Sequence, residues 1–229
     1  MLKTFRILPK TAPPLPTLGI PIFEEISKKG DSTIVLIPSK KVSGNFRSVI
    51  VAAQDFSNTK IHVIEMQLIG TALGTIVRKT VDWINEGVCF DQILENIKQL
   101  RKRVKIYFYV AILEFLHICD RIGPAKTFFG SVFQIKPILL FNQTEVNQFG
   151  IQPANKRPLE RIVELVSNEC PHSFDSYPSI FESDALEESV ELQHIFSPFF
   201  KINDINICDL PPAIIVYAGP VVIAASYFS

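Results

Sequence analysis

The chain has 229 residues, a length that suits one large domain or two small ones. Lysine plus arginine and aspartate plus glutamate each total 23, so the formal net charge is zero. This balance gives the protein no bulk attraction to nucleic acid or to an anionic membrane. Hydrophobic residues make up 47% of the chain and 18 residues are phenylalanine, which predicts a large buried core and leaves open an apolar cavity within it.

The N-terminal half of the sequence alternates helices and strands. Short runs of β-branched apolar residues predict strands at residues 33–37 and 61–66. Apolar residues at helical spacing predict helices at residues 20–29, 45–54, 71–86 and 90–101. An alternating order of this kind favours a mainly parallel, Rossmann-like sheet flanked by helices.

The composition changes after a basic run at residues 100–105, and we predict a domain boundary there. The N-terminal α/β domain then covers residues 1–103 and the C-terminal α/β domain residues 104–229. Strands are predicted in the second domain at residues 106–110, 137–141, 145–150, 179–182 and 202–207, and helices at residues 111–119, 124–132, 157–167 and 185–195. The hairpin signal at residues 142–144 favours a mixed or antiparallel sheet.

The last twenty residues, 210–229, carry no charge and approach the length of a membrane span. The Gly-Pro pair at 219–220 divides this stretch into two β-branched halves. We therefore predict two buried strands, at residues 213–218 and 221–228, and no stable insertion into a membrane.

The four cysteines, at positions 89, 119, 170 and 208, show no C-x-x-C spacing. The first residues also lack the charged and apolar regions of a secretion signal. Both features are typical of a reduced, cytoplasmic protein, and we expect that location.

The loop at residues 38–44 separates a predicted strand from a predicted helix and contains Ser43 and Gly44. Such a loop directs backbone N–H groups and a serine hydroxyl at whatever lies above the end of the strand, a position that suits an anionic group such as a carboxylate. The same two residues also fit a simple helix N-cap.

Motifs of common enzyme classes do not occur in the sequence. It contains no nucleophile elbow, no phosphate-binding P-loop and no dinucleotide-binding fingerprint. Glu114, His117 and Cys119 offer three zinc-ligand types, but no second cluster lies nearby and structural zinc usually takes four ligands. We therefore predict a protein that is not an enzyme and that holds no metal or cofactor.

Five segments of the chain resemble, in the same order, motifs of the DegV family of bacterial fatty-acid-binding proteins. KTAPPLP at residues 10–16 resembles a T-S-Q-P-S-P segment, and SKKVSGNF at 39–46 resembles S-x-x-x-S-G-T-Y. Further along, LEFLHICDRI resembles L-x-x-L-x-x-G-G-R-I, FGSVFQIKPI resembles a stretch ending in I-K-P-I, and YAGP at 217–220 stands where the family has H-T-G-P. The family's opening strand has no counterpart here, which implies an unpaired edge in the first sheet.

The resemblance implies two α/β domains of the EDD fold with a long-chain fatty acid between them. The acyl tail would be buried in one domain, and the carboxylate would meet hydroxyl groups near the interface. Thr11 and Ser43 match the two hydroxyl positions of the family, and Arg121 matches its arginine. Family members present the bound acid to a separate fatty acid kinase and do not catalyse its phosphorylation themselves.

Several family ligand positions carry other residues in this chain. Asn45 replaces a threonine and Tyr217 replaces a histidine, and both can still donate hydrogen bonds. We predict that the following residues bind the ligand: Thr11, Ser43, Gly44, Asn45, Arg121 and Tyr217. The alternative is a family scaffold that has lost lipid binding and acts through protein contacts, as a monomer or as a dimer paired at a sheet edge.

Overall fold

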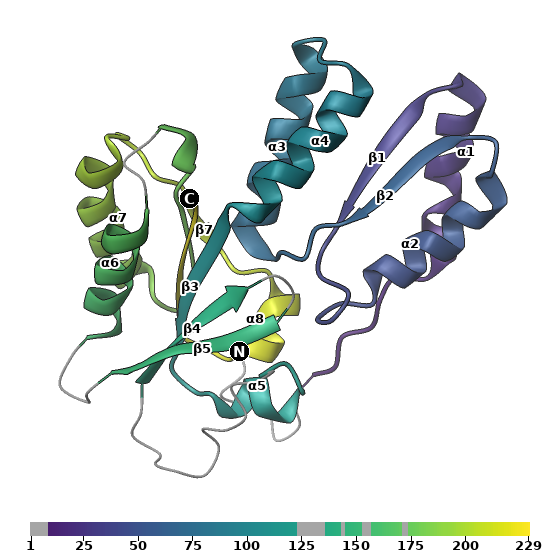
Figure 1. Cartoon of the computed structure of the whole chain (residues 1–229). Helices are drawn as coiled ribbons and strands as arrows, with labels where there is room; N and C mark the ends of the chain where they lie inside the picture. Colours follow the sequence, from purple (N-terminus) through teal and green to yellow (C-terminus); the bar gives the residue numbers. More distant parts are fainter. Residues whose placement is uncertain (1–8, 123–135, 143–144, 153–156, 171–173) are drawn as a thin grey trace.

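The computed structural model describes residues 9–122, 136–142, 145–152, 157–170 and 174–229. Within these residues the chain forms eight α-helices and eight strands, and the strands make two separate sheets (Figure 1). The predicted α/β fold is therefore confirmed. None of the described helices is long and apolar enough to cross a lipid bilayer.

The smaller sheet consists of two parallel strands, β1 (Ser32–Ile37) and β2 (Lys60–Glu65). Helices α1 (Ile20–Lys29) and α2 (Asn45–Ala53) lie on one side of it, as Figure 1 shows. Helices α3 (Gly70–Asn85) and α4 (Phe90–Lys102) lie on the other side, where they share an apolar cluster with both strands. The parallel sheet predicted from the alternation of strands and helices is confirmed.

The larger sheet has the strand order β5-β4-β3-β8-β6-β7, and all of its pairs are antiparallel except β6 with β7. Its strands are β3 (Val104–Val110), β4 (Lys136–Asn142), β5 (Glu145–Gln152), β6 (Ser179–Ser183), β7 (Ile207–Asp209) and β8 (Val222–Phe228). The predicted mixed sheet is confirmed, as is the pairing of β4 with β5.

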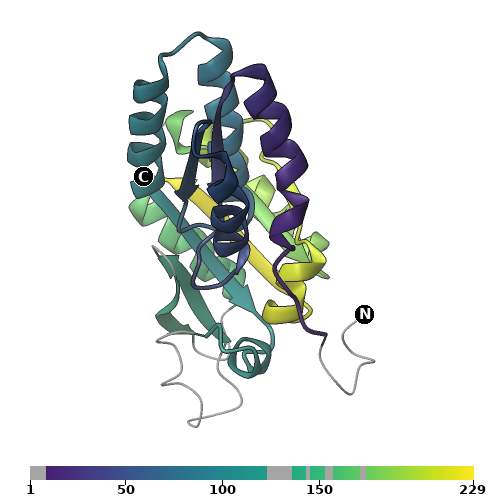
Figure 2. The same ribbon diagram turned by 90° about the vertical axis from the view of Figure 1, so that its right-hand side faces the viewer.

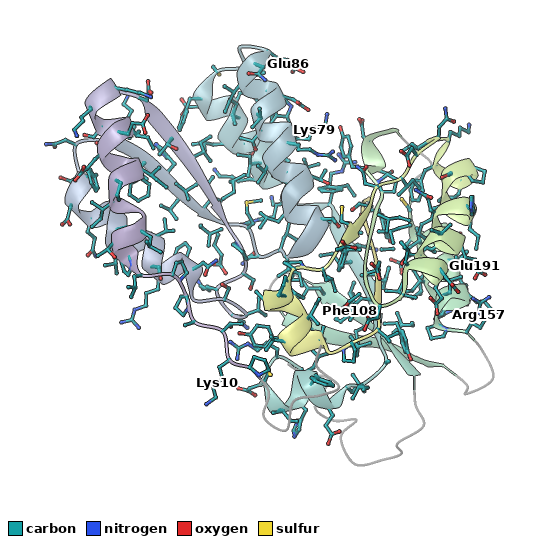
Figure 3. All side chains as sticks on the ribbon, turned by 180° about the vertical axis from the view of Figure 1, so that it is seen from behind. Lys10, Lys79, Glu86, Phe108, Arg157 and Glu191 are labelled. Carbon is teal, nitrogen blue, oxygen red and sulfur yellow. The ribbon has the colours of Figure 1, made fainter. Side chains whose placement is uncertain are left out.

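Side chains alternate between the two faces of this sheet, because successive residues of a strand point to opposite sides. Tyr107 of β3 belongs to the cluster under α6 (Pro158–Glu169) and α7 (Leu186–Phe200). Arg157, before α6, forms an ion pair with Glu191 of α7 at 2.6 Å on the exposed side of these helices (Figure 3).

The opposite face carries Ile106 and Phe108 of β3. It is covered by α5 (Glu114–Ile118), by α8 (Pro212–Ala218) and by the start of α3. Figure 2, turned by a quarter from Figure 1, also shows the α3–α4 hairpin rising above this sheet. The predicted boundary after residue 103 falls between α4 and β3, and it stays a prediction, since α3 contacts both β6 and β8.

The strand predicted at residues 213–218 is wrong, because this segment is the helix α8. Pro211 has an extended backbone and is followed by a second proline in the first helical turn, where the missing N–H and the fixed φ are favourable. Gly219, with φ 81°, ends the helix. The β-branched composition was outweighed by these two flanking signals.

Two further predictions need correction. The strand predicted at residues 202–207 is reduced to β7 (Ile207–Asp209), because Ile207 is the first residue in register with β6 and residues 202–206, with Asn203, Asp204 and Asn206 among them, form a loop. The helix predicted at residues 111–119 is limited to the five residues of α5. The helix predicted at residues 124–132 lies outside the described residues.

Candidate ligand-binding site

A cavity of about 590 Å³ lies between the two sheets. The loops that follow β1 and β2 line it on one side, and the apolar face of the larger sheet lines it on the other. The carboxyl ends of parallel strands are the usual place for ligands in open α/β sheets, because the strands' loops converge there. The volume is in the range of small-molecule binding sites.

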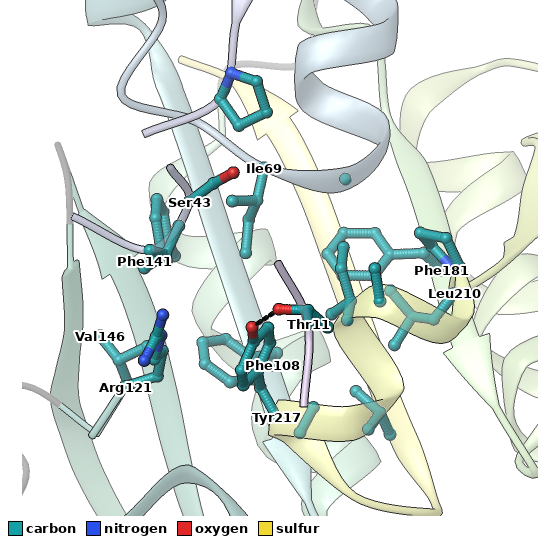
Figure 4. A pocket seen from close by; sticks show the side chains of 18 of the residues that line it. Thr11, Ser43, Ile69, Phe108, Arg121, Phe141, Val146, Phe181, Leu210 and Tyr217 are labelled. Carbon is teal, nitrogen blue, oxygen red and sulfur yellow. Dashed lines mark hydrogen bonds between the residues drawn. The ribbon is translucent and has the colours of Figure 1, made fainter. Parts of the chain in front are cut away.

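The inner wall of the cavity is apolar. Three phenylalanines from three different strands, Phe108, Phe141 and Phe181, contribute to it, together with Val146 of β5 (Figure 4). All four are buried, with no more than 7% of any side chain exposed. The wall therefore belongs to the hydrophobic core of the larger sheet and offers no hydrogen bond to a ligand that lies against it.

The loop after β1 is held in one conformation by its own hydrogen bonds. The buried residue Ser39 donates its N–H to the Leu68 carbonyl at 3.1 Å and accepts the N–H of Ser43 at its own carbonyl at 3.0 Å. The Ser43 hydroxyl accepts the N–H of Asn45, the first residue of α2, at 3.3 Å. Since a hydroxyl can accept and donate at once, Ser43 can still donate to a ligand.

Of the two residues that fit a helix N-cap in the sequence, Gly44 occupies that position. It has no side chain with which to cap α2, while the hydroxyl of the preceding Ser43 accepts the N–H of Asn45. A Cβ atom at position 44 would lie only 3.0 Å from the Cβ and Cγ atoms of Pro13. Glycine at this position therefore allows the N-terminal segment (residues 9–15) to lie against the loop.

The N-terminal segment crosses the cavity and meets α8. The hydroxyl of Thr11 is hydrogen-bonded to the hydroxyl of Tyr217 (Figure 4). The guanidinium of Arg121 lies over the face of the same tyrosine ring, with 4.8 Å between the Arg121 Cζ atom and the ring centroid. Three of the predicted residues thus form a continuous polar edge of the cavity.

Arg121 is held in place while keeping one donor unused. Its Nη1 atom donates to the carbonyl of Cys119 at 2.6 Å. Its Nε atom is buried and has no hydrogen-bond partner among the described residues. Burial raises the pKa of the Cys119 thiol, against the opposing effect of the Arg121 charge, so this cysteine remains a neutral thiol at pH 7. The arginine charge is therefore available to an anionic ligand.

The structure brings all six predicted residues to the same cavity. They come from four separate places: the N-terminal segment, the loop before α2 with the first residue of that helix, the residues after α5, and α8. That they bind a ligand stays a prediction. Among the described residues, which include Glu114, His117 and Cys119, no group of three His, Cys, Asp or Glu side chains that could hold a metal ion is found.

Sequence reasoning missed Thr71 and the residues around it. Ile69, Gly70 and Thr71 follow β2 and line the cavity beside the loop that follows β1. The Thr71 hydroxyl joins those of Ser179 and Ser226, at 2.8 and 3.2 Å. The sequence did carry a signal for this part of the site. Gly70 lies between a predicted strand and a predicted helix, as Gly44 does in the loop after the first strand.

Comparison with known proteins places the chain in one family. It is 24% identical over 211 residues to a DegV domain-containing protein of Clostridium acetobutylicum, covering 90% of this chain and 75% of that protein. It is 26% identical over 187 residues to Protein DegV of Bacillus subtilis, covering 81% of this chain and 66% of that protein.

Solved structures agree in fold. A fatty-acid-binding DegV family protein from Thermus thermophilus superimposes with a TM-score of 0.86 at 23% identity, covering 100% of this chain and 81% of that one. A fatty-acid-binding DegV family protein from Streptococcus agalactiae gives a TM-score of 0.87 at 22% identity, covering 99% and 81%. The sequence model of the DegV family, described as uncharacterised proteins, matches residues 2–229. The chain belongs to the DegV family.

Proposed function

We propose that this protein binds a long-chain fatty acid. The supporting observation is the combination, in one cavity of about 590 Å³, of an apolar wall built from a sheet face and a polar edge that contains an arginine. Solved relatives with the same fold are described as fatty-acid-binding, and one from Eubacterium eligens, with a TM-score of 0.83 and 16% identity, is loaded with heptadecanoic acid.

The tail supplies most of the affinity in this proposal. Burial of each CH₂ group contributes about 0.8 kcal/mol, so a long acyl chain offers on the order of 10 kcal/mol before the costs of association. A hydrogen bond to a charged head group contributes about 1.5–3 kcal/mol. The polar edge therefore sets orientation and selects for an acid, while the phenylalanine-rich wall sets how tightly any acyl chain is held.

The carboxylate would lie where Ser43, Thr11 and Arg121 can donate to it. The unused Nε of Arg121 gives a direct reason, because a buried N–H without an acceptor is costly and a carboxylate oxygen would satisfy it. Asn45 and Tyr217 also line the cavity and offer further donors. We expect less selective recognition than in relatives that keep all the family hydroxyls.

The protein acts in this proposal as a carrier and not as a catalyst. Thr11 and Gly44 are exposed, so the polar edge reaches the surface, where a partner enzyme has access to the head group. Presentation to a fatty acid kinase and a cytoplasmic location stay predictions.

The test begins with native mass spectrometry of freshly purified protein, followed by extraction with organic solvent. The proposal requires a bound mass equal to one long-chain acid, and rebinding of palmitic acid by the extracted protein. A protein that is empty as purified and that binds neither palmitic acid nor its methyl ester would contradict it, and would favour the alternative of a scaffold acting through protein contacts.

A further inference from the structure

Helix α3 has a buried face and, roughly 100° around the helix axis from it, an exposed apolar stripe. Ala72, Ile76 and Thr80 face the interior and are at most 5% exposed. Val77, Val81 and Ile84 face outward, with 41, 49 and 54% of their surface exposed. These positions follow the spacing i, i+4, i+7, so the three outward side chains form one stripe along the helix.

The stripe, Val77, Val81 and Ile84, lies where a second molecule can reach it. Figures 1 and 2 show that the α3–α4 hairpin rises above the larger sheet, and Figure 3 places Glu86 near its tip with Lys79 lower down. The helix also lacks a side chain at Gly74, one turn before Val77, where a Cβ atom would meet nothing within 4 Å.

One flank of the stripe carries two opposite charges, Arg78 and Asp82, four residues apart. Both residues are exposed. Asp82 has one partner within the helix, Lys79, at 3.4 Å. Arg78 forms no ion pair with another residue in the part of the chain that the structure describes, so its charge is available to an acidic group on another molecule.

We propose that two copies of this chain associate through α3, with the two helices antiparallel about a two-fold axis near residues 80 and 81. In this arrangement Val81 packs against its own counterpart, and Val77 against the partner's Ile84. Antiparallel helices bring the same flank of each copy together, so Arg78 lies opposite the partner's Asp82 and the pair occurs twice.

The occupant is a second copy because the apolar pair and the charged pair have nearly the same midpoint along the helix. The pair 77 and 84 is centred between residues 80 and 81, the pair 78 and 82 on residue 80, and Val81 on itself, so one two-fold axis near residues 80 and 81 lies within one residue of all three. A parallel arrangement would leave Arg78 and Asp82 without opposite charges across the contact. One helix pair is at the small end of protein interfaces, and the dimer is therefore reversible and populated at high protein concentration.

This contact is different from the dimer paired at a sheet edge that the sequence suggests, and it does not rest on the proposed function. The test is sedimentation velocity of the full chain over a wide concentration range. The wild-type protein should shift from monomer to dimer as the concentration rises. A monomer at every concentration would overturn the proposal.

Three variants locate the contact. Val81→Lys should abolish the dimer, and Arg78→Glu should weaken it by placing like charges opposite each other. The double change Arg78→Glu with Asp82→Arg should restore it, because the swapped charges are again complementary across the two-fold axis.

The matched control is Val190→Lys on α7, an exposed β-branched residue with 36% exposure, which should dimerise like wild type. A dimer that survives Val81→Lys, or that the double change fails to restore, contradicts the proposal.

Discussion

The hydroxyl of Thr11 is bonded to the hydroxyl of Tyr217, although 206 positions separate the two residues in the sequence. This bond ties the N-terminal segment to α8 across the cavity. Arg121 stacks on the same tyrosine ring, so the three residues are coupled. A carboxylate that binds here has to replace or extend a hydrogen bond that already exists, which limits the net gain from each hydroxyl.

The first prediction concerns the Tyr217 hydroxyl. Tyr217→Phe keeps the ring under Arg121 and removes only the oxygen, so affinity for palmitic acid should fall roughly two- to tenfold, the effect of a net hydrogen bond of about 0.5–1.5 kcal/mol. Isothermal titration of the extracted protein measures this. Tyr177→Phe is the control, because its hydroxyl bonds to Asp175 and it does not line the cavity. Equal affinities for wild type and Tyr217→Phe would remove this hydroxyl from the binding site.

The second prediction separates head from tail at Ser43. Ser43→Ala should weaken binding of palmitic acid by about tenfold or more, since a hydrogen bond to a charged group is worth about 1.5–3 kcal/mol. Binding of methyl palmitate should change little, because its ester head group is uncharged and gains less from a hydrogen bond to Ser43. Ser57→Ala, at an exposed serine outside the cavity, serves as the control. If acid and ester lost affinity equally, the effect would be on the loop and not on the head group.

The third prediction uses a series of saturated acids. Each added CH₂ should raise affinity roughly fourfold, the equivalent of about 0.8 kcal/mol, until the apolar wall is fully covered, and affinity should then level off. Competition titrations against a fluorescent acid give the series. Affinity that does not depend on chain length would show that the phenylalanine-rich wall takes no part in binding.

The fourth prediction is about stability at a turn. Gly219 has φ 81° and ψ −178°, a region that is nearly restricted to glycine, and a Cβ there would lie 2.7 Å from the Phe115 ring. Gly219→Ala should therefore lower stability by more than Gly30→Ala. Gly30 also has a positive φ, 70°, but a Cβ at that position meets nothing within 4 Å.

Thermal unfolding of the two variants measures the difference. We expect Gly30→Ala to cost about 1 kcal/mol and Gly219→Ala several times more, because only the second adds a collision to the backbone strain. Equal losses would mean that Phe115 moves aside without cost.

Local sequence patterns gave most elements of the fold but misjudged α8. Regular spacing predicted α1 with its correct ends, because Gly30 marks the stop as the left-handed C-cap. The β-branched run after Pro212 reads as a strand by composition, yet the residues of this run that line the cavity, Ala213, Ile214, Tyr217 and Ala218, have helical spacing. The prolines before this run and Gly219 after it were the local signals of a helix, and the contact with the cavity shows which of its sides faces inward.

The sequence predicted which residues line the candidate site but not how they contact one another. Thr11, Ser43 and Arg121 were found through family motifs, and they converge because the loop after β1, the N-terminal segment and the end of α5 meet in space. No local pattern predicts that Thr11 bonds to Tyr217, since their contact depends on how the whole chain packs. For the same reason Thr71, which has only a local helix signal, was missed.

The last prediction concerns Glu182, a carboxyl on β6 that is only 5% exposed. Burial raises its pKa, the N–H of Ala185 opposes this, and the neighbouring carboxyls of Asp209 and Asp184 raise it further, with a net shift upward. The folded protein therefore holds this proton more tightly than the unfolded chain. The stabilising effect is fully present below the unfolded pKa, about 4.3, and is lost as the pH rises through the folded pKa.

The Glu182 carboxyl accepts a hydrogen bond from the Ala185 N–H at 2.8 Å. In the Glu182→Gln variant the amide oxygen can still accept this bond, and the side chain has no charge. We therefore expect this variant to be more stable than wild type at pH 7 and close to wild type at pH 4. Chemical denaturation at several pH values from 4 to 8 measures the difference. The control is Glu187→Gln in the first turn of α7, because this carboxyl is exposed to solvent and not buried. A Glu182→Gln protein whose stability relative to wild type is the same at pH 4 and pH 7 would show that the charge of this carboxyl does not destabilise the folded state.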